Sequence, residues 1–472
     1  MEFVKNQWGH DQLVHDGYIF GKYQTRGEST YWICTQYKAG GCRAKCKISG
    51  GHVIVTDSHH NHPVNPAAVE VRRRLATMRT EALSTQDLPC QIVARAVATA
   101  SRSVAANLPA PALLTRAINY NRKIKDHRPV NPTSLADLEI PAKYTLTLND
   151  EPFLLANLGT ADRILIFSTD SDLKQLADSS NWHVDGTFKC APGIFTQLYS
   201  IHGVKSSTTL PLVYALLPNK TESTYLRFLQ ELKSLAAARE LELKPQQIMS
   251  DFEIAFLNAC QKTFPTTQPK GCYFHFSQCI WRKIQETPEI AEKYKVDDEF
   301  ALELRQLLAL SFVPVTDVVA SFDILMETPF FTENERLLMP LIHYYEDIWI
   351  GRPQRGRRRE PMFAHALWNT FTATANEEAR TNNSMEGWHR RFSSLIGAHH
   401  PSLWKFIDVL KTEQSQTQFR LNQLVAGVPP PAKRRKYKDL DQRLMNSIAK
   451  FGTIALTEYL IGIAQNVSFN TD

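Results

Sequence analysis

The sequence lacks any long hydrophobic run. Although 43% of its 472 residues are hydrophobic, no stretch approaches the roughly eighteen consecutive apolar residues that a membrane-spanning helix needs. Residues 1–10 also contain no apolar segment of the kind found in a secretory signal peptide. We therefore expect no membrane partner, and we expect the apolar residues to fill the cores of two or three domains.

Cysteine is scarce as well. The eight cysteines are scattered along the chain and intermixed with histidine. Small disulfide frameworks need a denser and more regular cysteine pattern, so this one favours a reducing compartment and zinc binding.

Acidic residues are few at the N-terminal end. Residues 1–130 hold 18 Lys and Arg against 9 Asp and Glu, a net charge of +9, whereas residues 131–472 hold 36 against 39, a net charge of −3. Such asymmetry is typical of proteins that bind polyanions, because contacts to phosphates release counterions. It favours a polyanion as a partner, although an ordinary solvated surface also carries a modest basic excess.

Four potential zinc ligands lie in this basic part. They are Cys34, Cys42, His60 and His62. Two sulfurs and two imidazoles complete a tetrahedral zinc site. On a strand, two histidines two residues apart would point the same way, and Gly40-Gly41 would allow the turn that brings Cys42 back to Cys34.

Two other interpretations of these residues remain open. Cys46 could replace Cys42 as a ligand, or the cysteines could be buried without metal beside a solvated histidine cluster. The runs Gly17-Tyr18-Ile-Phe20 and Tyr31-Trp-Ile-Cys34 resemble FLYWCH-type zinc fingers. The resemblance implies a small β-rich module for DNA or protein interaction over residues 1–66.

The next segment, 67–130, is predicted to be helical and basic. Helices are expected at Val69–Leu83, Cys90–Ser101 and Ala112–Lys125. The first carries the candidate DNA-binding residues Arg72, Arg73 and Arg74. Three short helices could form a helix-turn-helix or a plain connector, and residues 131–150 are predicted to be a linker.

The stretch Asn181–Pro192 places a carboxylate within an apolar strand. Side-chain alternation puts Trp182 and Val184 on one face and His183 and Asp185 on the other. A buried carboxylate needs a cation or an ion-pair partner, so Asp185 is either a metal ligand or a structural acid.

A second acid follows a later strand. Two apolar strands, a helix from Glu222 to Ala237 and a short strand from Gln247 are expected to lead to Asp251. In α/β sheets the carboxyl ends of strands form sites, and carboxylates are the usual protein ligands of Mg²⁺. Glu253 is the nearest alternative to Asp251.

Several motifs in order resemble the catalytic domain of Mutator-like (MULE) DNA transposases. They are Asp185-Gly-Thr-Phe-Lys-x-Ala-Pro192, Phe195-x-Gln-x-Tyr-x-Ile-His-Gly203, Ser250-Asp-Phe-Glu253, Cys272-Tyr-Phe-His275 and Thr381-Asn-Asn-Ser-Met-Glu-Gly-Trp-His389. The resemblance implies an α/β, RNase H-like fold with an all-α insertion. It also implies a catalytic triad of Asp185, Asp251 and Glu386 that binds Mg²⁺ or Mn²⁺.

The implied domains are a transposase core at 151–280, the insertion at 281–375, a core helix with the third acid at 376–415, and a basic tail with a C-terminal helix at 416–472. Glu377 and Glu378 are alternatives to Glu386. In the resemblance, Cys272 and His275 form a motif near the active site, whose other interpretation is a core cysteine with a hydrogen-bonded histidine. A strand is expected at Gly271–Phe274.

Arginines at 352–359 could contact phosphates or form a mobile charged loop. The basic run Lys433–Lys436 resembles a nuclear localisation signal, so we expect a nuclear protein. The resemblance implies a DNA transposase that carries out metal-dependent DNA cleavage and strand transfer, with zinc-finger DNA binding. Its expected partners are double-stranded DNA, namely transposon ends and target, and, in a possible homo-oligomer, a second copy of the chain. The alternative is a domesticated DNA-binding regulator that no longer transposes.

Overall fold

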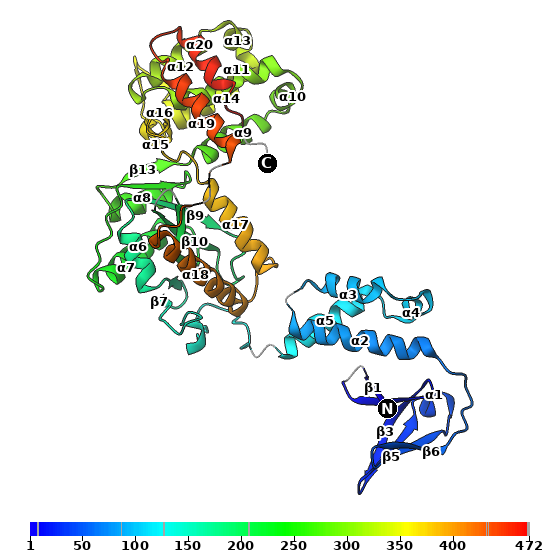
Figure 1. Cartoon of the computed structure of the whole chain (residues 1–472). Coiled ribbons are helices and arrows are strands. Elements are labelled where there is room, and N and C mark those ends of the chain that lie inside the picture. The colour runs from blue at the N-terminus through cyan, green and yellow to red at the C-terminus, as the bar shows by residue number, and fades with distance from the viewer. Residues whose placement is uncertain are drawn as a thin grey trace. The chain divides into compact units, whose positions relative to one another are not determined.

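The computed structural model describes residues 1–6, 9–85, 87–125, 128–205, 208–430, 432 and 434–469. The chain forms two compact units, Met1–Pro129 and Val130–Asp472 (Figure 1). Lys433, within the basic run of the suggested localisation signal, lies outside the described residues. In the described part of the chain, no helix is both long enough and apolar enough to cross a membrane.

The first unit opens with a six-stranded antiparallel sheet whose strands pair in sequence order. The strands are β1 (Glu2–Lys5), β2 (Asp11–His15), β3 (Tyr18–Arg26), β4 (Ser29–Cys34), β5 (Lys45–Ser49) and β6 (His52–Asp57). A short helix, α1 (Tyr37–Gly40), connects β4 to β5. It ends at Gly41, whose φ of 66° is left-handed and suits glycine.

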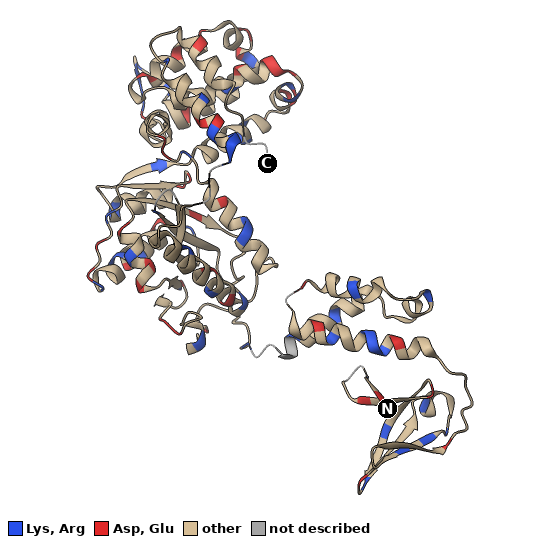
Figure 2. Cartoon of the chain, in the orientation of Figure 1, with Lys and Arg blue, Asp and Glu red and all other residues tan. Residues whose placement is uncertain are grey.

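Four helices follow, one more than the sequence predicts. They are α2 (Pro66–Ser84), α3 (Pro89–Ala98), α4 (Arg102–Asn107) and α5 (Pro111–Lys125). The long helix α2 packs against the other three, and its Met78 shares a small core with Ile92 and Ile118. Lys and Arg occur along both the sheet and the helices of this unit (Figure 2).

The second unit contains a seven-stranded mixed sheet in the order β13-β12-β9-β10-β11-β8-β7. The strands are β7 (Leu154–Leu158), β8 (Ile164–Phe167), β9 (Asn181–Thr187), β10 (Gln197–Lys205), β11 (Thr208–Leu217), β12 (Gln247–Ser250) and β13 (Gln268–Gly271). β9, β10 and β11 are antiparallel neighbours, while β12 runs parallel to both β9 and β13. This is the arrangement of an RNase H-like fold, as expected.

Helices cover both faces of this sheet. On one face, α7 (Glu222–Ala237) and α8 (Ile254–Thr263) pack over Trp182, Val184 and Ile201, with α6 (Asp170–Ala177) at the side. On the other, α17 (Asn383–Ile396) and α18 (Leu403–Val425) pack over Leu198 and Tyr214. Because side chains alternate along β9, His183 and Asp185 lie on the sheet face that α17 covers. A 3₁₀ turn, η1 (Ala142–Tyr144), precedes the sheet.

Between α8 and α17 the chain forms a second, helical core. Its elements are α9 (Tyr273–Gln285), α10 (Pro288–Val296), α11 (Asp298–Ala309), η2 (Leu310–Phe312), η3 (Val315–Asp317), α12 (Val318–Met326), α13 (Pro329–Glu333), α14 (Glu335–Tyr345), η4 (Glu346–Ile350), α15 (His365–Trp368) and α16 (Phe371–Ala375). The final helices α19 (Arg435–Ile448) and α20 (Leu456–Ala464) bury Leu444 and Leu460 in this same core. The apolar positions of these two helices therefore pack within the chain.

The strand expected at Gly271–Phe274 is wrong. β13 ends at Gly271, and α9 begins at Tyr273 with Cys272 as its N-cap residue. Phe276, Ile280 and Ile284 recur at helical spacing and are fully buried, so packing of this stripe favours the helix.

The arginine segment 352–359 is a short hairpin of β14 (Pro353–Gln354) and β15 (Arg357–Arg358). Arg352 and Arg359 pair with Asp347, and Arg358 pairs with Glu346 and Asp323. These ion pairs hold the segment against its own helices, so three of its five arginines have partners inside the unit.

Candidate metal-binding and active sites

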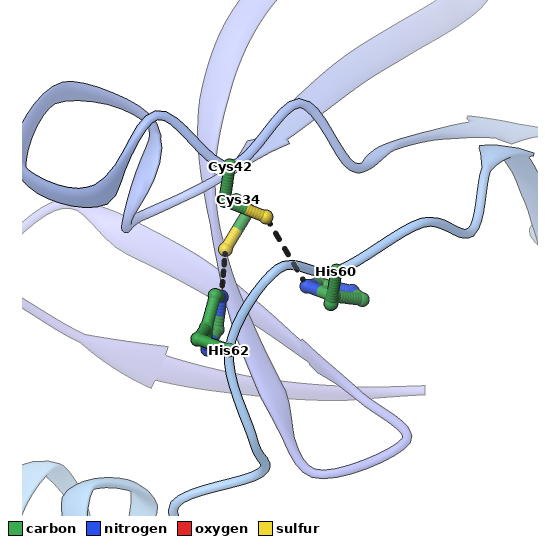
Figure 3. Close-up of side chains that lie close together, drawn as sticks. All are labelled: Cys34, Cys42, His60 and His62. Carbon is green, nitrogen blue, oxygen red and sulfur yellow. Dashed lines mark hydrogen bonds between the residues drawn. The ribbon is translucent and has the colours of Figure 1, made fainter.

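Cys34, Cys42, His60 and His62 meet in the first unit (Figure 3). One donor atom from each lies within 4.8 Å of the others, and both cysteines are buried. Among the described residues, no other set of three or more His, Cys, Asp or Glu donors lies so close together. The four residues come from the end of β4, the segment after α1 and the segment after β6.

The distances between these donors fit zinc. Cys34 Sγ lies 3.3 Å from His62 Nε2, and Cys42 Sγ lies 3.4 Å from His60 Nδ1. A tetrahedral zinc ion with normal bond lengths separates sulfur from nitrogen by about 3.5 Å. The Nδ1 of His62 lies 3.1 Å from the carbonyl oxygen of Pro63, so donation of its proton there leaves Nε2 free for metal.

Burial raises the pKa of the Cys34 thiol to about 11. In the absence of a cation the thiol therefore keeps its proton, and the buried pair of sulfurs gains most from a metal that stabilises thiolates. The donor set and its spacing thus indicate zinc.

The two histidines lie in a loop that other contacts hold in place. His60 and His62 follow β6 in irregular structure, so the expectation that a strand directs both rings is wrong. Instead the Tyr18 ring stacks on His60 with centroids 3.5 Å apart, and Asn61 Nδ2 donates to the carbonyl of Gly40. These contacts join the histidine loop to β3 and to the turn that precedes Cys42.

Cys46 lies outside this donor group. It is fully buried on β5, opposite Trp32 on β4, in the hydrophobic core of the sheet. Burial raises the pKa of its thiol to about 11. Its surroundings are those of an apolar core cysteine.

The three arginines on α2 differ in their contacts. Arg73 pairs with Glu2 and Glu70. Arg74 donates to the carbonyls of Ala96 and Thr99 at the C-terminal end of α3. Arg72 has no hydrogen bond or ion pair to another described residue. Two of the three predicted DNA contacts therefore have structural partners, and Arg72 is the one whose guanidinium is available.

Asp185 is buried near the end of the central strand β9, with 8% of its surface exposed. Its Oδ1 accepts a hydrogen bond of 2.8 Å from the backbone of Gly186. Burial and the nearby charges of Asp251 and Glu386 raise the pKa of Asp185 to about 8. An added Cβ at position 186 would lie 2.4 Å from Gln197 Oε1, so a larger residue beside the acid would displace the end of that side chain.

Asp251 follows β12, which runs parallel to β9 with Met249 opposite His183. Continuing this register by two residues brings Asp251 level with Asp185. The effect of Asp251 on the pKa of Asp185 agrees with that proximity. Glu253, the alternative acid, accepts a hydrogen bond from Tyr225 and lies 3.8 Å from Lys220. It therefore has protein partners of its own.

Glu386 occupies the first turn of α17, on the Asp185 face of the sheet. Met385, Trp388 and Phe392 form the buried side of that helix. Burial raises the pKa of Glu386, and its Oε1 is buried without a hydrogen-bond partner. Glu377 and Glu378 are exposed and precede the helix.

Cys272 and Asn382 fix the start of α17. The backbone N–H of Asn382 points at Cys272 Sγ, 3.2 Å away, and its side-chain amide lies 3.4 Å from the carbonyl oxygen of Val184. Cys272 therefore contributes to the position of the helix that carries Glu386. His275 lies close enough to Asp251 that the carboxylate affects its pKa, although burial dominates and lowers that pKa.

Sequence reasoning missed His389, which lies near Asp185, and Glu413, which contacts the helix α17. His389 Nδ1 lies 3.5 Å from Asp185 Oδ2; its spacing of three residues from Glu386 was the available signal. Glu413 on α18 accepts a 2.8 Å hydrogen bond from Trp388 Nε1 and pairs with Arg391, thereby clamping α17. Nothing local in the sequence points to Glu413.

These acids fit a divalent cation. Asp251 and Glu386 lie near enough to the buried Asp185 for their charges to raise its pKa, and Glu386 Oε1 is buried without a hydrogen-bond partner. Hard cations such as Mg²⁺ and Mn²⁺ bind carboxylate oxygens and would remove the repulsion. The carboxyl oxygens are more widely spaced than the cysteine and histidine donors.

Comparisons with known proteins agree with both sites. Residues 181–279 match the MULE transposase domain, and residues 3–62 match the FLYWCH zinc finger domain. FLYWCH-type zinc finger-containing protein 1 of Homo sapiens is 32% identical over 82 residues, which are 17% of this chain and 11% of that protein. The Mus musculus protein of the same name is 33% identical over 63 residues, which are 13% and 9%. The matched part is thus about a tenth of these relatives.

The structure and the matches define a two-part protein, in which a β-sheet module with a Cys/His metal site precedes an RNase H-like domain. The chain carries an N-terminal FLYWCH zinc finger domain and a MULE transposase domain.

Proposed function

We propose that this chain is a Mutator-like DDE transposase that cleaves DNA and transfers strands. The observation that carries the proposal is the approach of Asp251 and Glu386 to the buried Asp185 at the sheet of a MULE domain. A buried carboxyl whose pKa two neighbouring acids raise would be a liability in a purely structural core, whereas carboxylates are the ligands that a phosphodiester-cleaving cation site requires.

The chain's own residues have distinct parts in this proposal. Asp185, Asp251 and Glu386 would hold divalent cations, and Lys220, whose charge lowers the pKa of Asp185, would attract a phosphate. Bound Mg²⁺ or Mn²⁺ would activate water or a 3′-hydroxyl and stabilise the leaving oxygen. Cys272 and Asn382 keep Glu386 directed at the sheet by anchoring the start of α17.

The first unit would bind DNA. Zinc held by Cys34, Cys42, His60 and His62 supports the finger fold, and the net charge of +9 over residues 1–130 supplies attraction to phosphates. Within α2, Arg72 is the arginine we assign to DNA. We also propose nuclear localisation, since the substrate would be chromosomal DNA and a basic run begins at Lys433.

A nicking assay tests the catalytic proposal. The probe is a supercoiled plasmid carrying the genomic sequences that flank the coding region on both sides, incubated with zinc-loaded protein and Mg²⁺ or Mn²⁺. We expect metal-dependent nicks at defined positions for the wild-type protein and for the control Asp178→Asn, which alters an exposed acid of the same unit. Asp185→Asn should retain DNA binding and lose cleavage.

One outcome tests the role of Asp185, and another distinguishes a transposase from a domesticated regulator. Cleavage that persists in Asp185→Asn removes this acid from the mechanism. Binding of the flanking DNA with no cleavage by the wild-type protein under either metal supports a domesticated regulator instead.

A further inference from the structure

We propose that His389 is an additional ligand of the divalent cation at Asp185, and that its imidazole makes this site prefer Mn²⁺ to Mg²⁺. The inference rests on the proposed function, because it concerns the same acidic site. It adds a nitrogen donor to a set that otherwise consists of carboxylates.

The position of His389 is set by α17. The residue lies three positions after Glu386, so both side chains project from the same side of the helix, one turn apart. At the start of that helix, Asn382 contacts Val184 of β9 and Cys272. Further along it, Trp388 and Arg391 both bond to Glu413 of α18. These anchors determine where the ring lies relative to Asp185.

The contact with Asp185 is poorly suited to a plain hydrogen bond. The Nδ1 atom lies 3.5 Å from Oδ2, and only 13% and 11% of the two side chains are exposed. Good N–H···O bonds measure about 2.7–3.2 Å. Two ligands at right angles around an ion with bonds of about 2.1 Å lie roughly 3 Å apart, so a small side-chain adjustment would let one cation contact both.

The other polar atoms nearby also lack partners. His389 Nε2 and Glu386 Oε1 are buried without a hydrogen bond in the described structure. Buried polar atoms without partners are uncommon in folded proteins, and an absent ion is one of their standard explanations. An imidazole that binds a cation through Nδ1 directs its Nε2 away from that cation, so Glu386 Oε1, one helical turn from His389, is the unpartnered atom that supports a cation beside Asp185.

A nitrogen ligand would change which metal the site selects. Mg²⁺ strongly prefers oxygen donors, whereas Mn²⁺ and the later divalent metals accept imidazole more readily. Loss of the ring should therefore weaken Mn²⁺ binding much more than Mg²⁺ binding. A histidine that only orients Asp185 would affect both metals alike.

The experiment measures metal binding directly, with the full-length protein and zinc already in its finger. Electron paramagnetic resonance would give the Mn²⁺ affinity, and competition would give the Mg²⁺ affinity. Pulsed measurements would report whether a nitrogen nucleus is coupled to bound Mn²⁺. We expect nitrogen coupling in the wild-type protein and in the control His399→Ala, which changes an exposed histidine just after α17.

In His389→Ala we expect loss of nitrogen coupling and at least about tenfold weaker Mn²⁺ binding, with Mg²⁺ affinity changed by less than about threefold. His389→Gln, which keeps the size and an N–H donor, should behave in the same way. Should the alanine variant fail to fold, the glutamine variant and the wild-type spectrum still show whether His389 binds the cation.

Three results would overturn the inference. They are wild-type Mn²⁺ without nitrogen coupling, coupling that persists in His389→Ala, and coupling lost instead in His275→Ala. Asp185→Asn separates the two proposals. If it binds Mn²⁺ as tightly as the wild-type protein does, the acidic site itself is refuted, whereas a metal bound at Asp185 without nitrogen refutes the role of His389 alone.

Discussion

Replacing Asp185 by asparagine should stabilise the second unit when divalent cations are absent. The amide keeps the shape of the carboxyl group and can still accept the hydrogen bond from Gly186. It removes the cost of ionising a buried acid beside Asp251 and Glu386, which raises the pKa of Asp185 from 3.8 to about 8. A residue proposed to be essential for catalysis would thus be unfavourable for the stability of the metal-free fold.

The size of this effect follows from proton linkage. Because the folded-state pKa is the higher one, the folded protein binds more protons than the unfolded chain between about pH 4 and pH 8, and the free energy of unfolding falls as pH rises. Relative to a neutral side chain, Asp185 lowers the free energy of unfolding by about 2 kcal/mol at pH 5 and by about 5 kcal/mol at pH 8. For a unit of roughly 340 residues, a gain of about 5 kcal/mol in Asp185→Asn raises the midpoint of thermal unfolding by about 7 °C.

Thermal unfolding would check this prediction, following the transition of the second unit in buffer without Mg²⁺ or Mn²⁺. The advantage of Asp185→Asn over the wild-type protein should grow from pH 5 to pH 8, and Asp178→Asn should show no such trend. Added Mn²⁺ should raise the wild-type midpoint and leave Asp185→Asn unchanged. Equal midpoints of wild-type protein and Asp185→Asn at pH 8 without metal would refute the reasoning.

Three further predictions concern the scaffold of the two sites. Cys34→Ser should reduce bound zinc from one equivalent to none by mass spectrometry of metals, whereas Cys46→Ala should keep it, since Cys46 lies outside the donor group. Glu413→Ala should lower the free energy of unfolding by about 2–3 kcal/mol, because the buried Trp388 Nε1 loses its acceptor and Arg391 loses its ion-pair partner; denaturant titration measures this, and an unchanged midpoint contradicts it. Arg74→Ala should destabilise the first unit by about 1–2 kcal/mol through lost bonds to α3, whereas Arg72→Ala should weaken DNA binding in a gel shift without changing stability.

Local patterns were sufficient for much of the fold. Apolar spacing predicted the helix Glu222–Ala237 with the bounds that the structure has. Alternation along β9 placed His183 and Asp185 on the face opposite Trp182, and the buried packing of Trp182 agrees. These features depend on neighbours within a few residues, which one sequence displays directly.

Local sequence patterns failed to predict the structure of segments whose conformation depends on packing against distant residues. Tyr273 and Phe274 have the composition of a strand, yet they begin α9, because the buried stripe that starts in this helix packs into the helical core. The C-terminal helices likewise complete that core rather than forming a separate surface. Burial against distant residues outweighed local preference in both cases.

The sequence by itself determined which residue types were available for the chemistry, namely two cysteines and two histidines near the N-terminus and acids at the ends of strands. Only the tertiary structure decided how they meet. The parallel register of β12 with β9 brings Asp251 to Asp185, and the contact of Asn382 with Cys272 sets the helix that presents Glu386 and His389. Such contacts join residues far apart in the chain, and their geometry depends on the packing of the whole sheet and its helices.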